Sequence, residues 1–472
     1  MTDRAIPLCV ALDGALTPVD TLHESLLALA HRAPSTLLRL PLWLCRGRDV
    51  LKREVAARAK FDATELPFNS QLLDWLTLER AAGRRLILVT DADSRIANEV
   101  GSQLNLFDEI IATNPDSHSP DAIRSALVAR FGERGFDYAG NSKAHDLLWA
   151  SARKAIVVGT SAEVDRTRQL TDVEQSFPAG GWTARLWIKS FRIHQWAKNA
   201  LIFLPALFSH RILQSQVLIE SALAFLAFSL CASGVYVIND LFDLTADRRH
   251  RRKRGRPFAD GRLTARSGFV ASSVLLFGAI CLALAVGYRF TAVLCGYYFL
   301  TWAYSLRLKQ VALVDVMTLA ALYTLRIIAG SSATSIPVSF WLLAFSIFIF
   351  LSLGIAKRYT EIHDAKEVGN VAIAGRGYTA ADLPFLLSIG VAAGYCTVVV
   401  LAFYINSGDS LVLYHHRKPL WLVCPLLLFW VSRIWLLTTR GKMPDDPVVF
   451  ALRDRSSWFV LGIIALIVLV SL

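Results

Sequence analysis

The stretch Asn239-Asp240-Leu241-Phe242-Asp243-Leu244-Thr245-Ala246-Asp247 decides the fold of the larger part of this chain. It places three carboxylates at the end of an apolar run that starts near Val217. In a helix, positions 240, 243 and 247 lie on one face, because residues three and four apart are neighbours. Like charges repel and charge at membrane depth is costly, so carboxylates in this position indicate a functional site.

A magnesium ion would relieve this repulsion. Proteins hold Mg²⁺ with one or two carboxylates, while its other ligands come from water and substrate phosphates. A basic run follows at once, made of Arg248, Arg249, Arg251, Arg252, Lys253, Arg254 and Arg256. Acidic residues for a metal beside basic residues for phosphate are what a diphosphate site needs. The alternative is a solvated acidic helix end just outside the bilayer.

The apolar content of 54% over 472 residues is too high for an ordinary soluble protein. Residues 1 to about 180 have a soluble composition, and apolar runs separated by short charged loops follow. Several runs reach the roughly 20 residues that span a bilayer. We predict an N-terminal α/β domain and an all-α polytopic membrane bundle of about nine transmembrane helices, at 197–213, 216–239, 266–288, 290–305, 311–333, 337–356, 382–406, 419–438 and 456–472.

Basic residues in the loops predict the orientation. Loops after even-numbered segments carry most of them: the run Arg248–Arg256, Arg307 with Lys309, Lys357 with Arg358, and Arg440 with Lys442. The positive-inside rule then places the N-terminus and the acidic motif on the cytoplasmic side of the inner membrane.

The remaining composition excludes other classes. This loop asymmetry largely explains the net charge of +12, and no recognition helix or aromatic-interleaved basic strand indicates a nucleic-acid partner. The seven cysteines form no C-x-x-C pair, so neither a zinc site nor a disulfide framework is indicated.

The N-terminal part alternates strands with helices. Apolar strands are predicted at 6–12, 86–90 and 155–159, with a mostly helical insert at 20–66. This order is typical of a parallel, Rossmann-like sheet, whose ligands lie at the carboxyl ends of the strands. We therefore divide the chain into an α/β domain at 1–165, a linker at 166–188 that contains Pro178-Ala179-Gly180-Gly181, and a membrane domain at 189–472.

Three motifs of the N-terminal domain resemble those of the haloacid dehalogenase-like phosphatases: Ala11-Leu12-Asp13-Gly14-Ala15-Leu16, Thr90, and Asp137–Asp146. The resemblance implies that Asp13 is the general acid and Thr90 the second motif. However, Ala11 stands at the position of the nucleophilic Asp, and Asn141 stands where a metal-binding Asp is more usual. We find no lysine for the third motif near 117–121. Without a nucleophile, the domain cannot form the covalent aspartyl-phosphate that these phosphatases need. Binding of a phosphorylated ligand is the alternative function.

Four motifs together resemble the UbiA superfamily of intramembrane prenyltransferases: Ser190–Asn199, Asn239–Asp247, Lys253–Ala259 and Tyr304–Lys309. The resemblance covers about residues 185–472. It implies a nine-helix bundle with a central cavity, a Mg²⁺-bound diphosphate near the cytoplasmic mouth, and a lateral opening for a polyprenyl chain.

The second acidic motif of aromatic prenyltransferases, D-x-x-x-D, keeps one carboxylate here, because Asp315 is followed four residues later by Leu319. The segments 314–330 and 195–199 are instead similar to the decaprenyl-phosphate phosphoribosyltransferase branch. That branch transfers phosphoribose from phosphoribosyl pyrophosphate to a polyprenyl phosphate. The alternatives are prenylation of an aromatic or other small acceptor by a polyprenyl diphosphate, a transporter, or a non-catalytic membrane scaffold.

The resemblance implies a role for each polar motif residue. The Mg²⁺ ligands would be Asn239, Asp240, Asp243 and Asp247. Phosphate oxygens would bind Lys198, Asn199, Lys253, Arg254, Arg256, Lys357 and Arg358, although for each loop cation a topology signal is the alternative. Asp315 would be a second metal ligand or base, with Tyr304 and Lys309 closing the cavity mouth. Arg326 lies eleven residues after Asp315 on the same helical face, which favours a buried ion pair between them.

Overall fold

The computed structural model describes residues 6–59, 61–112, 120–141, 143–178, 183–250, 253–367, 376–444 and 446–472. The chain divides into two compact units. Unit 1 contains Met1–Phe191 together with Tyr236–Ser272, and unit 2 contains Arg192–Val235 and Ser273–Leu472. The acidic motif (residues 239–247) and the basic loop after it (residues 250–264) therefore belong to the same unit as the N-terminal sheet.

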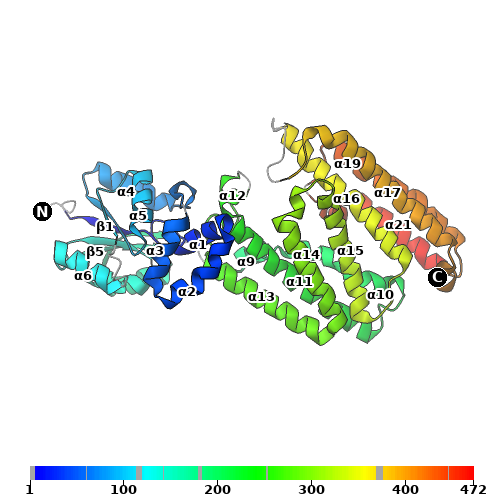
Figure 1. The fold of residues 1–472 in the computed structure, drawn as a ribbon, viewed down its shortest axis with the longest axis horizontal. Helices are drawn as coiled ribbons and strands as arrows, with labels where there is room; N and C mark the ends of the chain where they lie inside the picture. The colour runs from blue at the N-terminus through cyan, green and yellow to red at the C-terminus, as the bar shows by residue number, and fades with distance from the viewer. Residues whose placement is uncertain are drawn as a thin grey trace. The chain divides into compact units, whose positions relative to one another are not determined.

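Unit 1 is built on a six-stranded sheet, shown in Figure 1, whose strands all run parallel in the order β3-β2-β1-β4-β5-β6. The strands are β1 (Leu8–Ala11), β2 (Leu86–Thr90), β3 (Glu109–Ala112), β4 (Asp137–Gly140), β5 (Lys154–Gly159) and β6 (Asp172–Pro178). The central strands β1 and β2 are buried along their whole length, as expected for a parallel sheet covered on both faces. The predicted parallel α/β architecture is confirmed.

Helices cover both faces of this sheet. Figure 1 shows α4 and α5 on one side and α6 on the other. The helices are α1 (Thr21–Arg32), α2 (Leu40–Cys45), α3 (Arg48–Ala59), α4 (Ser70–Ala81), α5 (Ser94–Leu104), α6 (Pro120–Phe131), α7 (Asp146–Ser151), α8 (Ser161–Arg168) and α9 (Ala184–Ser190). The first three, with short 3₁₀ helices at Pro34–Arg39 and Ala63–Glu65, form the helical insert predicted between the first two strands.

Strand β6 corrects one prediction, because it lies within the segment 166–188 that was expected to be a linker. Of its seven residues, Phe177 is buried and packs on Trp75 with ring centroids 5.8 Å apart, whereas most of the others are exposed. An edge strand with little burial needs no continuous apolar run, so the sequence pattern does not reveal it.

The remaining elements are helical. They are α10 (Leu204–Phe208), α11 (Ser215–Phe242), α12 (Leu244–Arg249), α13 (Ala265–Val286), α14 (Tyr288–Leu306), α15 (Val314–Thr334), α16 (Phe340–Glu367), α17 (Leu383–Asn406), α18 (Gly408–Leu413), α19 (Val423–Thr439), α20 (Pro447–Arg453) and α21 (Arg455–Ser471). Within unit 2, α15 packs between α14 and α16, and α16 packs between α15 and α17.

Six described helices are long and apolar enough to cross a membrane, or seven if α20 and α21, which are bent by 73°, form one span. The chain is therefore an integral membrane protein, but the predicted count of nine spans is not confirmed. The predicted segment 197–213 consists of a 3₁₀ helix, Ile193–Phe203, followed by the short α10. The predicted segment 290–305 lies in α14, which is not among the six.

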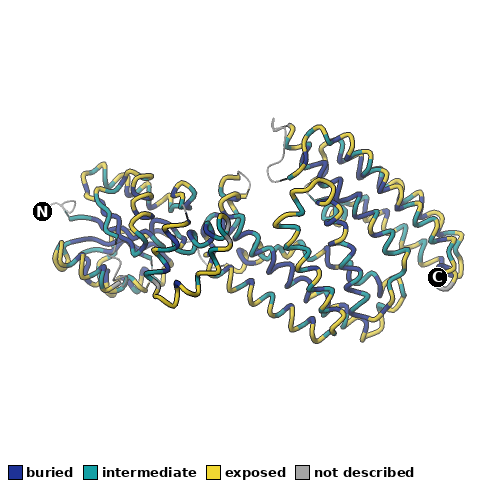
Figure 2. Tube along the Cα trace, viewed as in Figure 1, coloured by how far each residue is buried: buried dark blue, intermediate teal, exposed yellow. Residues whose placement is uncertain are grey.

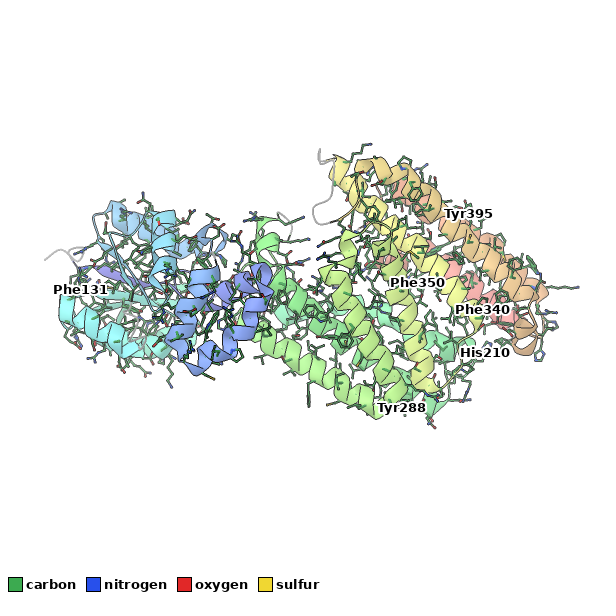
Figure 3. All side chains as sticks on the ribbon, viewed as in Figure 1. Phe131, His210, Tyr288, Phe340, Phe350 and Tyr395 are labelled. Atoms are coloured by element: carbon green, nitrogen blue, oxygen red, sulfur yellow. The ribbon has the colours of Figure 1, made fainter. Side chains whose placement is uncertain are left out.

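The outer faces of the helices carry exposed apolar side chains. Phe340 and Tyr288, labelled in Figure 3, are more than 70% exposed, whereas Phe350 stacks on Tyr323 with ring centroids 4.8 Å apart. Figure 2 shows exposed residues along the whole length of α13, and only 17% of its most apolar stretch is buried. Apolar surface of this extent suits contact with lipid.

Asp137 anchors β4 through a buried ion-pair network. Its carboxylate accepts hydrogen bonds from Nε and Nη2 of Arg153 at 3.0 and 2.6 Å, from the Lys154 amide at 3.0 Å, and from Arg84. Removing one member of a buried ion pair leaves the other charges uncompensated.

We predict that Asp137→Asn lowers the free energy of unfolding of unit 1 by about 3 kcal/mol. Asp165→Asn is the control, because Asp165 forms an exposed pair with Arg168 at 2.9 Å. Pulse proteolysis of the detergent-solubilised chain in urea measures both effects. Equal urea midpoints for the two variants would contradict a stabilising role for the buried network.

Candidate functional site

The acidic motif spans the junction of two helices. Helix α11 ends at Phe242, α12 begins at Leu244, and Asp243 lies between them. The amide of Asp243 donates to the Asn239 carbonyl at 2.9 Å, and the amide of Asp247 donates to the Asp243 carbonyl at 2.8 Å. These bonds keep the helical i to i−4 spacing across the junction, which is the spacing that the sequence predicted for one acidic face.

Arg256 joins two of the three carboxylates. Its Nη1 donates to Oδ1 of Asp240 at 3.0 Å and to Oδ2 of Asp247 at 2.6 Å. Asp240 is 4% exposed and Asp247 2%, whereas the Arg256 side chain is 26% exposed. Burial raises the pKa of Asp247 above its ordinary value, although the charge of Arg256 opposes this shift. Two buried carboxylates so close together require a cation between them.

The donor set at this position fits Mg²⁺ as part of a ligand shell. Asp240 and Asp247 are hard oxygen donors that already face one cation, and the half-buried Asp243 and Asn239 lie on either side of Asp240 in sequence. Over the described ranges, no three His, Cys, Asp or Glu side chains are grouped closely enough to hold a metal by themselves. A metal here would thus take further ligands from water or substrate oxygens, as Mg²⁺ commonly does.

The basic loop after the motif is only partly neutralised. Lys253 and Arg254 are exposed, and neither side chain pairs with a carboxylate in the part of the chain that the structure describes. The charge of Lys253 acts on Asp247. Arg248 and Arg249 instead pair with Glu24 and Glu65 of the helical insert. The predicted cations Arg251 and Arg252 lie outside the described residues.

A second polar cluster surrounds Asp315 in unit 2. Arg358 donates Nε to Oδ2 of Asp315 at 2.6 Å and Nη2 to Oδ1 at 2.9 Å, and the Tyr304 hydroxyl donates to Oδ1 at 2.9 Å. Arg376 lies 3.4 Å from the same oxygen. Asp315 and Arg358 are fully buried, and Glu361 contacts both arginines. Asp315 therefore has two arginines and a phenol around it.

Two sequence predictions about arginines were wrong. Arg358 was placed in a loop after the segment 337–356, but α16 continues to Glu367, so Arg358 is buried within a helix. Arg326 does not pair with Asp315. Its Nε donates to Oδ1 of Asn199 at 2.8 Å, and its guanidinium lies 5.0 Å from the ring centre of Tyr297. Helical spacing placed Arg326 on the buried face of α15 together with Asp315. It could not identify which neighbouring side chains reach the guanidinium.

Lys198 and Asn199 have structural partners in unit 2. Lys198 pairs with Asp446, and the amide nitrogen of Asn199 donates to Ser229 at 3.0 Å. Burial opposes ionisation of Asp446, but the charges of Lys198 and Lys357 outweigh it and hold the pKa of Asp446 below its ordinary value.

Lys309 is half-buried on the 3₁₀ helix Leu308–Gln310 and forms no ion pair with any described carboxylate.

The motif residues of the N-terminal domain meet at the carboxyl edge of the sheet. Ala11 ends β1, Thr90 ends β2, and Asn141 follows β4. The carboxylate of Asp13 accepts hydrogen bonds from the Thr21 amide at 3.2 Å and from the Thr21 hydroxyl at 3.0 Å.

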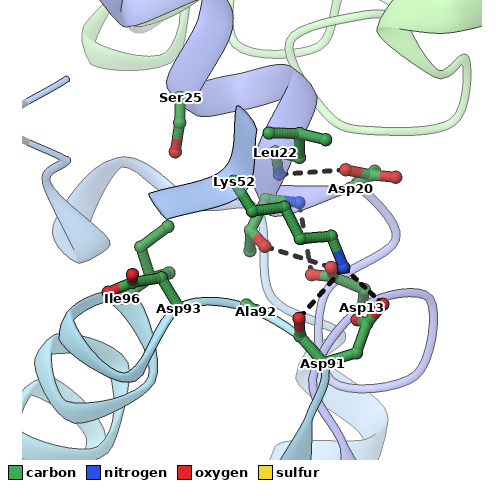
Figure 4. Close-up of a pocket in the computed structure, with 10 residues that line it drawn as sticks. Asp13, Asp20, Leu22, Ser25, Lys52, Asp91, Ala92, Asp93 and Ile96 are labelled. Atoms are coloured by element: carbon green, nitrogen blue, oxygen red, sulfur yellow. Dashed lines mark hydrogen bonds and ion pairs between the residues drawn. The ribbon is translucent and has the colours of Figure 1, made fainter. Parts of the chain in front are cut away.

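A small cavity of about 40 Å³, shown in Figure 4, lies beside these residues. Burial, together with the charges of Asp20 and Asp91, raises the pKa of Asp13 to about 8. Lys52 extends from α3 into this pocket and donates to Oδ2 of Asp91 at 2.6 Å. No lysine was predicted for the third motif near 117–121, and the lysine that reaches this pocket comes instead from the helical insert. Ser142 and the segment 117–119 lie outside the described residues.

Sequence reasoning also missed Glu24, Glu65, Glu361, Arg376 and Asp446. Each is a charged residue whose partner lies far away in the sequence or belongs to a motif that it does not share. Glu361 lies one helical turn after Arg358, but no periodicity or spacing connects the other four residues to their partners, so only the fold could reveal those pairs.

The chain is similar to several known proteins. It is 38% identical to the uncharacterized protein y4nM of Sinorhizobium fredii, over 98% of this chain and 90% of that protein. It is 30% identical to the decaprenyl-phosphate phosphoribosyltransferase of Mycobacterium tuberculosis, over 57% of this chain and 88% of that protein. The solved structure of a UbiA homolog from Archaeoglobus fulgidus bound to GPP and Mg²⁺ is 17% identical, with a TM-score of 0.46 over 61% of this chain and 99% of that chain.

The family model of the UbiA prenyltransferases matches residues 202–467, which include the acidic motif, the basic loop and the cluster around Asp315. This match covers more than half of the chain. The chain therefore belongs to the UbiA prenyltransferase family.

Proposed function

We propose that this protein transfers a phosphoribosyl group from phosphoribosyl pyrophosphate to a polyprenyl phosphate in a Mg²⁺-dependent reaction. The observation that carries this proposal is the environment of Asp315. Its partners are Arg358, Arg376 and Tyr304, and the next helical turn offers Leu319 instead of a second carboxylate. Asp315 and Glu361 are already paired with two arginines, so a second metal would meet two guanidinium groups, whereas the partly exposed guanidinium of Arg376 can bind a phosphate oxygen.

Similarity supports the same choice. The relative named decaprenyl-phosphate phosphoribosyltransferase matches over 57% of this chain and most of its own length. The donor of the proposed reaction carries a 5-phosphate as well as a diphosphate, and its acceptor carries a phosphate. The exposed Lys253 and Arg254 and the half-buried Arg256 supply cations for these groups.

The residues of this chain would act mainly by binding and orienting. Asp240, Asp243 and Asp247, with Asn239, would hold Mg²⁺, which supplies charge neutralisation to the leaving diphosphate. Arg256 bridges two of these carboxylates and, being partly exposed, would turn its guanidinium to a phosphate oxygen. Arg358 would orient Asp315, and the partly exposed Arg376 beside it would offer its guanidinium to a substrate phosphate. The acceptor phosphate oxygen then attacks the ribose carbon as the diphosphate departs.

The orientation in the membrane is part of this proposal. The basic loops indicate that the N-terminal sheet and the acidic motif face the cytoplasm. A water-soluble phosphorylated donor would then reach the site from the cytoplasm, while the polyprenyl phosphate arrives from the bilayer.

We predict that Asp240→Asn and Asp243→Asn each lower transfer at least about 100-fold, because each removes a carboxylate that would ligate the metal. Glu220→Gln is the control, since Glu220 lies in the same helix and hydrogen-bonds Gln216. Label transfer by purified, monodisperse variants measures the effect. EDTA should stop the wild-type reaction and excess Mg²⁺ should restore it. Normal activity of Asp240→Asn would exclude Asp240 as a ligand of a metal that the reaction needs.

The donor is tested by following label. We expect purified protein to move label from phosphoribosyl pyrophosphate into butanol-extractable lipid only when polyprenyl phosphate is present. A parallel reaction supplies labelled prenyl diphosphate with a panel of aromatic acceptors. Transfer from the prenyl donor, with the ribosyl donor inert, would replace the proposed reaction by prenylation and leave the metal site standing. Inertness of both donors would favour a transporter or scaffold.

We also propose that the N-terminal domain is a dehalogenase-like fold without phosphatase activity. Asp13 lies at the carboxyl edge of the sheet with a raised pKa, as a general acid requires, but Ala11 provides no nucleophile. The full chain should therefore not hydrolyse p-nitrophenyl phosphate above background, and Ala11→Asp tests whether a carboxylate alone restores turnover. Hydrolysis by the wild type that is lost in Asp13→Asn would refute the proposal.

A further inference from the structure

One ion pair joins the helical insert of the N-terminal domain to the acidic motif. Arg248 donates Nη1 and Nη2 to the two carboxylate oxygens of Glu24 at 2.9 and 2.8 Å, and both side chains are about 90% buried. This geometry is the bidentate arrangement that gives an arginine pair both strength and direction. The third donor of Arg248, Nε, bonds the Ala259 carbonyl at 2.9 Å. Arg248 therefore connects α1 to the basic loop.

Apolar packing reinforces this ion pair. Leu27 lies one turn after Glu24 on α1 and is buried in a cluster with residues of α9, α11, α12 and the basic loop. The cluster comprises Leu27, Leu186, Trp187, Val237, Leu241, Leu244, Phe258, Ala259, Leu263 and Ala265. The same face of α1 thus supplies one charged and one apolar contact to the segment that carries the acidic motif.

Gly261 in the basic loop and Arg249 directly before this loop also contact the N-terminal domain. Gly261 has a φ of +78°, and a Cβ there would lie 2.6 Å from Cγ of Pro18 and 3.2 Å from Cγ of Pro67. Arg249 pairs with Glu65 in the 3₁₀ helix of the insert. These contacts are independent of Glu24, so the loop is held at several points.

At one end, these contacts connect to residues beside the candidate metal ligands. Arg248 directly follows Asp247 in α12, and Ala259 lies three residues after Arg256, whose guanidinium bridges Asp240 and Asp247. At the other end, Thr21 at the start of α1 is tied to Asp13 after β1. A displacement of Arg248 would therefore move both α12 and the loop that carries Arg256.

We propose that Glu24 is a positioning residue for the metal and diphosphate site, and that the N-terminal domain braces this site in cis. The proposal rests on the proposed transfer reaction. Glu24 touches neither donor nor acceptor. It fixes the direction of Arg248, and through Arg248 it sets the spacing of the carboxylates that receive the metal. Outer groups of this kind commonly change metal affinity or activity when they are removed.

The test compares Glu24→Gln with Glu54→Gln in the purified full-length chain. Glu54 is a matched control, because it lies in the same insert and its ion-pair partner Arg58 is on its own helix, α3, and not in the basic loop. For Glu24→Gln we expect the Mg²⁺ concentration for half-maximal transfer to rise about tenfold, with the wild-type value for Glu54→Gln. Unchanged Mg²⁺ dependence in Glu24→Gln would overturn the brace.

A charge swap separates positioning from direct phosphate binding. If Glu24 acts by holding Arg248, the double variant E24R/R248E should restore the Mg²⁺ dependence to within about threefold of wild type, while R248E alone stays impaired. If Arg248 itself binds donor phosphate, the swap stays as impaired as R248E, and Glu24→Gln tightens donor binding. Either of these two results would overturn the proposal.

Hydrogen exchange provides a readout that does not need activity. In Glu24→Gln, amides of residues 253–263 should exchange faster than in wild type, while β1 and β2 keep their protection. Unchanged exchange in the loop would overturn the brace even if the swap variant failed to fold. The Mg²⁺ titrations of all variants use whichever diphosphate donor the wild type accepts. A wild type that accepts only a prenyl donor would therefore refute the proposed reaction without deciding the brace.

Discussion

The guanidinium of Arg256 between Asp240 and Asp247 is the interaction on which the rest of this arrangement depends. Two carboxylates at the end of an apolar helix repel each other and are nearly excluded from water, so each needs a cation. The chain meets this need by folding the basic loop back over the helix end. Arg256 remains partly exposed, and the proposed binding of a metal and a phosphate requires its guanidinium to turn away from these carboxylates.

The buried carboxylate of Asp315 also needs a cation, but its partners are two arginines and a tyrosine hydroxyl. Asp315 and Arg358 are fully buried in a bidentate pair, and Tyr304 and Arg376 occupy one of the same carboxylate oxygens. Such a pair is costly to break, because either partner alone would be an uncompensated buried charge. The first cluster is thus suited to exchange of its cation, and the second is suited to holding arginines in a constant orientation.

The N-terminal domain contacts the residue that follows the acidic motif through the ion pair between Glu24 and Arg248. Ala11 and Thr90 lie at the carboxyl edge of its sheet, and the helix that begins beside Asp13 supplies Glu24 to Arg248. A parallel sheet covered on both faces is a rigid support, and a loop that carries several cations benefits from one, since its charges repel each other.

The sequence alone determined the parallel α/β sheet, the apolar helices and the acidic face, because these depend on local periodicity and on residues close together in the chain. It also determined the family, through motifs that are contiguous. Only the tertiary structure decided that β6 belongs to the sheet, that Arg326 turns to Asn199 instead of Asp315, and that Glu24 holds Arg248. A polar edge strand has no apolar pattern, and a long side chain can reach several neighbours. Ion pairs between residues more than two hundred positions apart leave no trace in local sequence, so their partners follow from packing alone.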